Sequence, residues 1–193
     1  MKIRLEITGT TPLMMHNDRL SDPSNPITMQ IKELTAKKTN KTIRDEDDIS
    51  KLEWMGSAYT DENNEIVMPC ANIIRCLRDA GAITRKSKDI ARALSPLNIR
   101  VPLLIDGPRK LDELWGQSQY IDKRMVKVKA GRIKRTRPIF PKWALVADFD
   151  LLDTVMNPSA LENIIEIAGA STGLGDARVL GYGRFKTKIT KSK

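Results

Sequence analysis

The chain has 193 residues, with 33 Lys and Arg against 24 Asp and Glu and a formal net charge of +9. This length is enough to bury a core without disulfides or structural metals, and the excess of positive charge favours a polyanion partner, most often nucleic acid. No apolar run reaches the roughly 18 residues of a membrane span, the first residues do not resemble a signal peptide, and Cys70 and Cys76 lack the second pair that a zinc site needs. The composition therefore predicts a cytoplasmic protein with no metal or cofactor and no membrane partner.

The chain begins with a stretch that is typical of a half-buried strand. Residues 2–8 alternate charged and apolar side chains, which places Ile3, Leu5 and Ile7 on one face. A polar loop follows and carries His16, the only histidine. We expect the first strand to lead into an exposed loop.

Two amphipathic segments come next and predict a helical insertion at about residues 26–56. Pro26 suits the start of a helix, and apolar residues then recur at helical spacing, at Ile27, Ile31 and Leu34. The acidic residues 45–48 suit the N-terminus of a second helix.

The middle of the chain predicts another helix and a further strand. Pro69 suits the helix start, and Gly81 is placed to end it. Arg75 and Arg78 share a polar face of this helix. Residues 99–105 are typical of a strand at the edge of a sheet.

The segment from 123 to 142 has the most one-sided charge in the chain, because it contains basic residues and no acidic residue. Basic and apolar side chains alternate on both sides of Ala130 and Gly131, which predicts a basic hairpin at about residues 123–142. Lys and Arg neutralise phosphates and release counterions, so this hairpin is the main predicted contact with nucleic acid. The alternative is a solvated basic face without a ligand.

A glycine-rich loop lies between the last predicted helix and the last predicted strand. The helix begins at Pro158, and the glycines of the loop are Gly173, Gly175, Gly181 and Gly183. A dinucleotide fold requires the opposite order, with a strand before the loop and a helix after it. We therefore expect the glycines to be structural first, and the loop residues that touch an anionic ligand to be Arg178, Tyr182 and Arg184.

The order of these segments predicts an α+β fold. Two helices that alternate with antiparallel-type strands favour a sheet with helices on one face. The ferredoxin-like, or RRM-like, β-α-β-β-α-β arrangement fits a single domain over residues 1–193, decorated by the helical insertion and the basic hairpin.

Three short stretches resemble the RAMP superfamily, the repeat-associated RNA-binding proteins of CRISPR systems. The glycine-rich loop with residues 181–185 is the most specific match. Residues 67–78 resemble the strand, proline and first-helix signature of effector backbone subunits, with Cys70 and Ala71 where those subunits carry Gly and Ser. Residues 11–13 match the end of their first strand. The layout is also similar to stand-alone RAMP-like proteins encoded by phages and prophages.

This resemblance implies binding of single-stranded nucleic acid, RNA or DNA, often by copies that assemble side by side along the strand. Together with the charge, it predicts a non-catalytic, mostly sequence-independent binding protein that forms homo-oligomers or filaments. The expected contact residues are Arg75, Arg78, Lys123, Arg124, Lys127, Lys129, Arg132, Lys134, Arg135, Arg137, Arg178, Tyr182 and Arg184.

Two other functions stay open. RAMP proteins that process RNA often use a loop histidine without a metal, and this role would fall to His16 as acid or base in a metal-independent endoribonuclease. Some backbone subunits use a loop aspartate, and Asp18 and Asp22 lie in a comparable loop. The last alternative is a phage interaction protein that docks on, or mimics, a host CRISPR effector subunit.

Overall fold

A computed structural model describes residues 1–37, 41–128 and 131–191 of the chain. Its central sheet is antiparallel and has the strand order β10-β1-β9-β4, so that the two ends of the chain pair side by side. A fifth strand, β6, pairs with the opposite end of β9 from β4. The strands are β1 Lys2–Gly9, β4 Leu94–Pro96, β6 Leu104–Ile105, β9 Trp143–Leu151 and β10 Phe185–Lys191.

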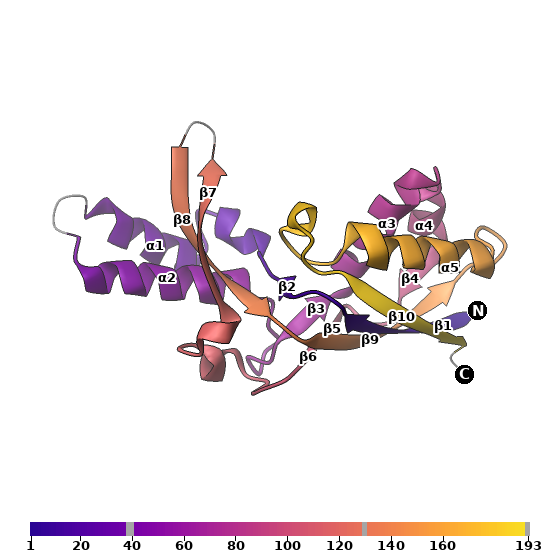
Figure 1. Cartoon of the computed structure of the whole chain (residues 1–193), viewed down its shortest axis with the longest axis horizontal. Helices are drawn as coiled ribbons and strands as arrows, with labels where there is room; N and C mark the ends of the chain where they lie inside the picture. Colours follow the sequence, from indigo (N-terminus) through magenta and orange to yellow (C-terminus); the bar gives the residue numbers. More distant parts are fainter. Residues whose placement is uncertain (38–40, 129–130, 192–193) are drawn as a thin grey trace.

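Helices cover one face of this sheet (Figure 1). They are α3 Cys70–Ile83, α4 Ser87–Ala93 and α5 Pro158–Ile167, and a π-helical turn, η5 Ala168–Thr172, continues α5. The alternation predicted for β1 is confirmed, because Ile3, Leu5 and Ile7 are buried. Strand order and helix placement are those of a ferredoxin-like fold, so the predicted fold class is confirmed.

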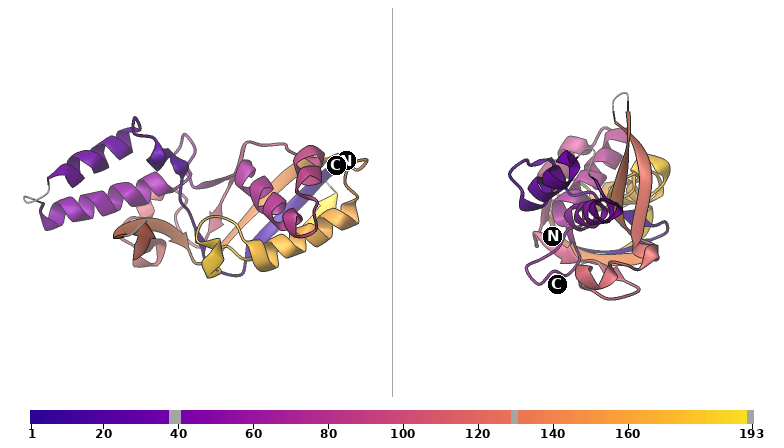
Figure 2. Two further views of the ribbon diagram at one scale, coloured as in Figure 1. Left: turned by 90° about the horizontal axis from the view of Figure 1, so that it is seen from above. Right: turned by 90° about the vertical axis from the view of Figure 1, so that its left-hand side faces the viewer.

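Two further helices project from one end of this body (Figure 2). They are α1 Pro26–Ala36 and α2 Ile43–Ser57, and a short 3-10 helix, η1 Asp18–Ser21, precedes them. α2 begins at a capping box, in which the Thr42 hydroxyl accepts from the Asp45 N–H and the Asp45 carboxylate accepts from the Thr42 N–H. The ammonium group of Lys37 and the capping bonds hold the pKa of Asp45 far below its ordinary value. Thr42 and Asp45 therefore fix the start of the second helix.

A second sheet carries the basic residues. Its order is β2-β8-β7, and its strands are β2 Leu13–Met14, β7 Ile121–Val128 and β8 Gly131–Phe140. β7 and β8 form a hairpin that rises from the body beside α2 (Figure 1). The 3-10 helices η3 Leu111–Leu114 and η4 Ser118–Tyr120 lead into it.

Two predicted boundaries are wrong, and tertiary packing explains both. α3 continues past Gly81, where a Cβ would overlap the side chain of Ile90 from α4, so glycine serves helix packing instead of ending the helix. The expected strand at 99–105 is divided. β5 Arg100–Pro102 pairs with β3 Val67–Pro69, Leu103 donates its N–H to the carbonyl of Ile66, and β6 then pairs with β9.

Candidate nucleic-acid interface

The outer face of the central sheet offers no platform for stacking bases. RRM domains bind RNA through aromatic side chains on the sheet, but the outward-facing residues of β1, β9 and β10 include no aromatic side chain. Ion pairs occupy this face instead: Arg4 Nε lies 2.8 Å from Asp148 Oδ1, and Lys188 Nζ lies 3.8 Å from Glu6 Oε2. The interface must therefore be sought around the hairpin and the glycine-rich loop.

The glycine-rich loop folds back on itself and on β2. Its four glycines have φ angles between 71° and 88°, which glycine adopts most readily. A Cβ at Gly183 would overlap the carbonyl oxygen of Leu174, and one at Gly175 would overlap that of Met14. Several loop amides, those of Gly173, Leu174, Asp176 and Gly183, donate to backbone carbonyls of this chain. The glycines thus shape the loop, and these amides are not available to an anion.

Tyr182 joins the loop to the hairpin. Arg124 Nη2 donates to Tyr182 Oη at 2.7 Å, and the guanidinium carbon lies 5.1 Å from the centroid of the tyrosine ring. Arg124 also bonds the carboxylate of Asp122, and these contacts raise the pKa of Arg124. Arg124 therefore covers the Tyr182 ring, and the two residues join the loop to the hairpin.

The two loop arginines have different environments. Arg178 Nη1 lies 3.0 Å from Asp79 Oδ2 of α3. Arg184 Nη2 donates to the backbone carbonyl of Arg178 at 3.2 Å, and its Nη1 is buried close to Gly173. Arg184 therefore supports the loop, whereas Arg178, in the 3-10 turn η6 Arg178–Leu180, is the better placed of the two to meet a ligand.

The basic hairpin has no acidic residue between 123 and 142, yet the fold brings acidic partners to it. Glu53 of α2 is buried, and its carboxylate binds the Arg135 guanidinium and the Thr136 N–H. Arg137 Nη1 lies 3.0 Å from Asp176 Oδ2, and Lys134 Nζ lies 3.9 Å from Glu46 Oε2. Much of the positive charge of the hairpin is therefore neutralised by residues that are distant in the sequence.

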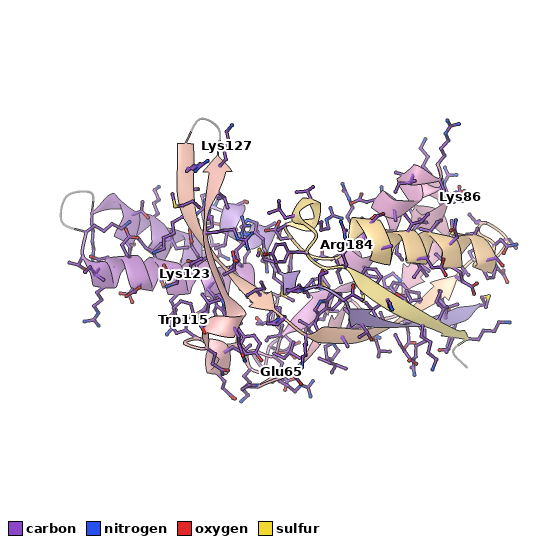
Figure 3. The ribbon with its side chains drawn as sticks, viewed as in Figure 1. Glu65, Lys86, Trp115, Lys123, Lys127 and Arg184 are labelled. Atoms are coloured by element: carbon purple, nitrogen blue, oxygen red, sulfur yellow. The ribbon has the colours of Figure 1, made fainter. Side chains whose placement is uncertain are left out.

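One face of the hairpin keeps its charge. In the strand register Lys127 lies opposite Arg132 and Lys123 lies opposite Thr136, so the alternation places four cations on the same face. We call this the basic face: Lys123, Lys127, Arg132 and Lys134. In the described part of the chain, all except Lys134 lack an acidic partner, and Lys123 Nζ lies 5.9 Å from the Trp115 ring centroid (Figure 3). The remaining predicted hairpin contact, Lys129, lies outside the described residues.

Two clefts adjoin the base of the hairpin, and His16 lines both. The helix–hairpin cleft, about 540 Å³, lies between α1, α2 and β8, and its lining includes His16, Ile31, Lys32, Glu53, Arg135 and Arg137. The loop cleft, about 220 Å³, lies between α3 and the glycine-rich loop, and its lining includes His16, Asn72, Arg75, Asp176 and Arg178. Because His16 lines both clefts, the two clefts lie next to each other.

His16 is exposed at this junction, and Ser57 lies beside it. The His16 Nδ1 atom is 3.4 Å from Ser57 Oγ. Partial burial lowers the pKa of His16, the nearby Arg137 guanidinium lowers it further, and Asp176 opposes the change. The imidazole is therefore mostly neutral at pH 7.

The structure divides the predicted contact residues into groups. Arg75, Arg135, Arg137 and Arg178 line a cleft, whereas Arg124 and Tyr182 join the loop to the hairpin and Arg184 supports the loop. Arg78 is exposed on α3 and lines neither cleft. Lys32 and Asn72 are among the cleft residues that sequence reasoning missed. Lys32 could have been found from the helical periodicity of α1, but Asn72 has no distinguishing local signal.

Neither a metal site nor a membrane span is found in residues 1–37, 41–128 and 131–191. There, no three His, Cys, Asp or Glu side chains group in a way that would hold a metal ion. Nor is any helix there both long enough and apolar enough to cross a membrane.

Comparison with known proteins gives a likeness of fold. No protein-family model and no curated protein matches the sequence. Among solved structures, a chain from the cryo-EM structure of the type III-B Cmr-beta bound to cognate target RNA is similar, with a TM-score of 0.55 and 12% identity over 98% of this chain. This chain spans 60% of the length of that one. At this identity the likeness shows a shared fold alone.

Proposed function

We propose that the protein binds single-stranded nucleic acid, with RNA as the first ligand to test, along a path from the basic face to the two clefts that meet at His16. The observation that carries this proposal is the set of cations that β8, the glycine-rich loop and α3 contribute to the clefts around one histidine, together with the basic face of the hairpin. The fold shared with a chain from an RNA-bound structure supports RNA as the ligand class.

The sugar–phosphate backbone supplies most of the affinity in this proposal. Lys and Arg neutralise phosphates and release counterions, a contribution that does not depend on sequence. The outer face of the sheet has no aromatic side chain on its three long strands, and Arg124 covers the ring of Tyr182. Base stacking on these surfaces therefore contributes little, and sequence preference is weak.

A band-shift series with matched single-stranded RNA, single-stranded DNA and duplex tests the proposal. We expect the single strands to bind, with an affinity that falls steeply between about 50 and 200 mM salt. Absence of a shift with both single strands at the lowest salt concentration would contradict the proposal. Tighter binding of the duplex than of the single strands would mean that the ligand of this surface is double-stranded nucleic acid.

The affinity for a uridine oligomer should increase as the pH is lowered, because the bases of this oligomer do not titrate in the range and the chain has one histidine. His16 has a lowered pKa in the free protein, next to Arg137 and Arg135, with Asp176 and Glu53 opposing them. A nearby phosphate raises that pKa, so binding takes up a proton. The affinity rises as the pH falls through the bound-state pKa and levels off below the free-state pKa.

The expected gain between pH 7.5 and 5.5 is about fivefold, which corresponds to about 1 kcal/mol for a partly exposed ion pair. Fluorescence anisotropy across this range measures it. His16→Gln should bind with an affinity that is nearly independent of pH. If this variant keeps the full pH dependence, His16 does not lie on the path.

A second candidate function is metal-independent cleavage of RNA. The observation that favours it is the exposed imidazole, neutral at pH 7 and next to Ser57 and the cations of both clefts, which suits a general base. Denaturing gels of the bound RNA test it without added metal. Products that disappear in His16→Gln would support cleavage, and intact RNA after long incubation would exclude it.

Assembly of copies along a strand, and docking on an effector complex, stay predictions from the resemblance. Sedimentation of the protein with RNA oligomers of increasing length tests the first. Complexes whose mass grows in steps with the length of the RNA would support assembly, whereas a constant mass would contradict it.

A further inference from the structure

The helix–hairpin cleft has two walls of different chemistry. α1 and η1 contribute the apolar side, with Leu20, Ile31 and Ala36 and the methyl groups of Thr28 and Thr35. β8 contributes the opposite side, where Arg135 and Arg137 flank Thr136. A sugar–phosphate backbone would contact the charged wall alone. A ligand that also contacts the apolar wall must therefore have an apolar part.

The apolar wall is incompletely covered by the chain itself. α1 has no fully buried residue, and Ile27, Ile31 and Leu34, the apolar stripe of this helix, are all half-buried. Since burying apolar surface stabilises by about 25 cal/mol per Å², a ligand with an apolar surface gains affinity here. Ile31, which lines the cleft, is the central residue of this stripe.

The charge of the cleft selects an anion. Lys32 of α1 and the arginines 135 and 137 of β8 line it, and Glu53 is the one acidic residue of the described lining. The carboxylate of Glu53 already accepts from Arg135 and from the Thr136 N–H. Arg137 is likewise paired with Asp176, so Lys32 is the lining cation without an acidic partner in the described part of the chain. The cleft therefore combines a small net positive charge with an apolar wall.

We propose that the helix–hairpin cleft receives one nucleotide of the bound strand, with its base against α1 and its phosphates at Lys32, Arg135 and Arg137. A nucleotide unites the two required properties, because its base has flat apolar faces and its phosphates are anionic. The cleft volume of about 540 Å³ lies within the range of small-ligand sites, about 300–1,000 Å³. An aliphatic wall makes van der Waals contact with any base, so the site accepts a base without reading its identity.

This inference rests on the proposed function and gives α1 and α2 a role in it. The basic face and the loop cleft bind the backbone, and the helical pair supplies the surface for one base. In this arrangement the affinity depends on the presence of a base at the cleft, although it does not depend on which base is present.

The test compares a uridine RNA oligomer with an abasic oligomer of the same length, which retains sugars and phosphates. We expect the protein to bind the uridine oligomer about tenfold more tightly, because burial of about 55 Å² of one base at about 25 cal/mol per Å² corresponds to this ratio. Thr35→Leu with Ala36→Leu places two larger side chains in the cleft and should remove this preference, because the uridine oligomer loses more affinity than the abasic oligomer. Both residues are exposed on α1 and line the cleft.

The matched control is Met29→Leu with Gln30→Leu, which adds two leucines at exposed positions of α1 that do not line the cleft. This variant should keep the preference for the uridine oligomer. Equal affinity of the unmodified protein for both oligomers, or a preference that survives in the cleft variant, would overturn the inference while the proposed function stands. Failure to bind either oligomer at low salt would instead contradict the proposed function.

A measurement on the unmodified protein covers the case in which the cleft variant does not fold. In methyl NMR spectra, nuclear Overhauser effects between the Ile31 methyl groups and the base protons of the uridine oligomer are expected. Ile43, which is exposed and does not line the cleft, should show none. Ile31 signals that do not respond to RNA would assign the cleft to a partner of another class, such as a peptide, and would also overturn the inference.

Discussion

Lys127→Glu combined with Arg132→Glu weakens RNA binding roughly 30-fold, if each cation contributes about 1 kcal/mol through a charge-assisted contact with phosphate. The two residues lie opposite each other in the strand register, are exposed, and have no acidic partner in the described part of the chain. Their replacement therefore removes contacts with the ligand without breaking an ion pair of the fold. Fluorescence anisotropy at several salt concentrations measures the loss.

The salt dependence gives a second, independent measure of the same change. The slope of log affinity against log salt should become shallower by about 1.4, because each contact with a single-strand phosphate contributes about 0.7. Lys88→Glu with Arg92→Glu is the matched control. It changes the net charge equally at exposed positions of α4, at the opposite end of the molecule near Lys86 (Figure 3). Equal losses for both pairs would mean that net charge, and not the basic face, determines binding.

Glu53→Gln lowers the free energy of unfolding by about 2 kcal/mol, because it leaves the Arg135 guanidinium without its counter-ion. Loss of one partner from a fully buried pair costs about 3–5 kcal/mol, but the Arg135 side chain is 40% exposed and regains part of its hydration. Urea unfolding of the unmodified protein and the variant measures the difference. The hairpin should also become less firmly attached to α2, which hydrogen exchange at the Thr136 amide reports.

Glu46→Gln is the matched control for this change. Glu46 also lies on α2 and also faces the hairpin, but its side chain is 44% exposed; its carboxylate lies 2.5 Å from Lys41 Nζ and 3.9 Å from Lys134 Nζ. Because such exposed pairs contribute little each, we expect a change below about 1 kcal/mol. If the two variants were equally destabilised, burial of Glu53 would not be the cause.

The elements that could be predicted from the sequence are those with a local pattern. Ile3, Leu5 and Ile7 have the period of two of a half-buried strand, and their burial in β1 follows from it. Pro158 marks the first turn of α5, where Asn157 caps the helix by accepting from the Ser159 N–H. The hairpin also has its own alternation, so its existence and position follow from the sequence.

What could not be predicted depends on contacts between distant residues. The run from 123 to 142 has no acid of its own, and nothing in it reveals that Arg135 meets Glu53, 82 positions earlier. The end of α3 depends on Ile90, which packs where Gly81 has no side chain. His16 could be identified as the one histidine, but its place between two clefts arises when α1, β8 and the glycine-rich loop come together.

The divided strand at 99–105 has a consequence for association between molecules. A long, regular edge strand is a template on which another chain can extend the sheet, and short edge strands prevent this. On the side of β9 the edge consists of β4 and β6, three and two residues long, with the chain diverted to β3 between them. β10 on the other side is seven residues long and continuous. Any partner that joins the central sheet by strand addition would therefore do so along β10.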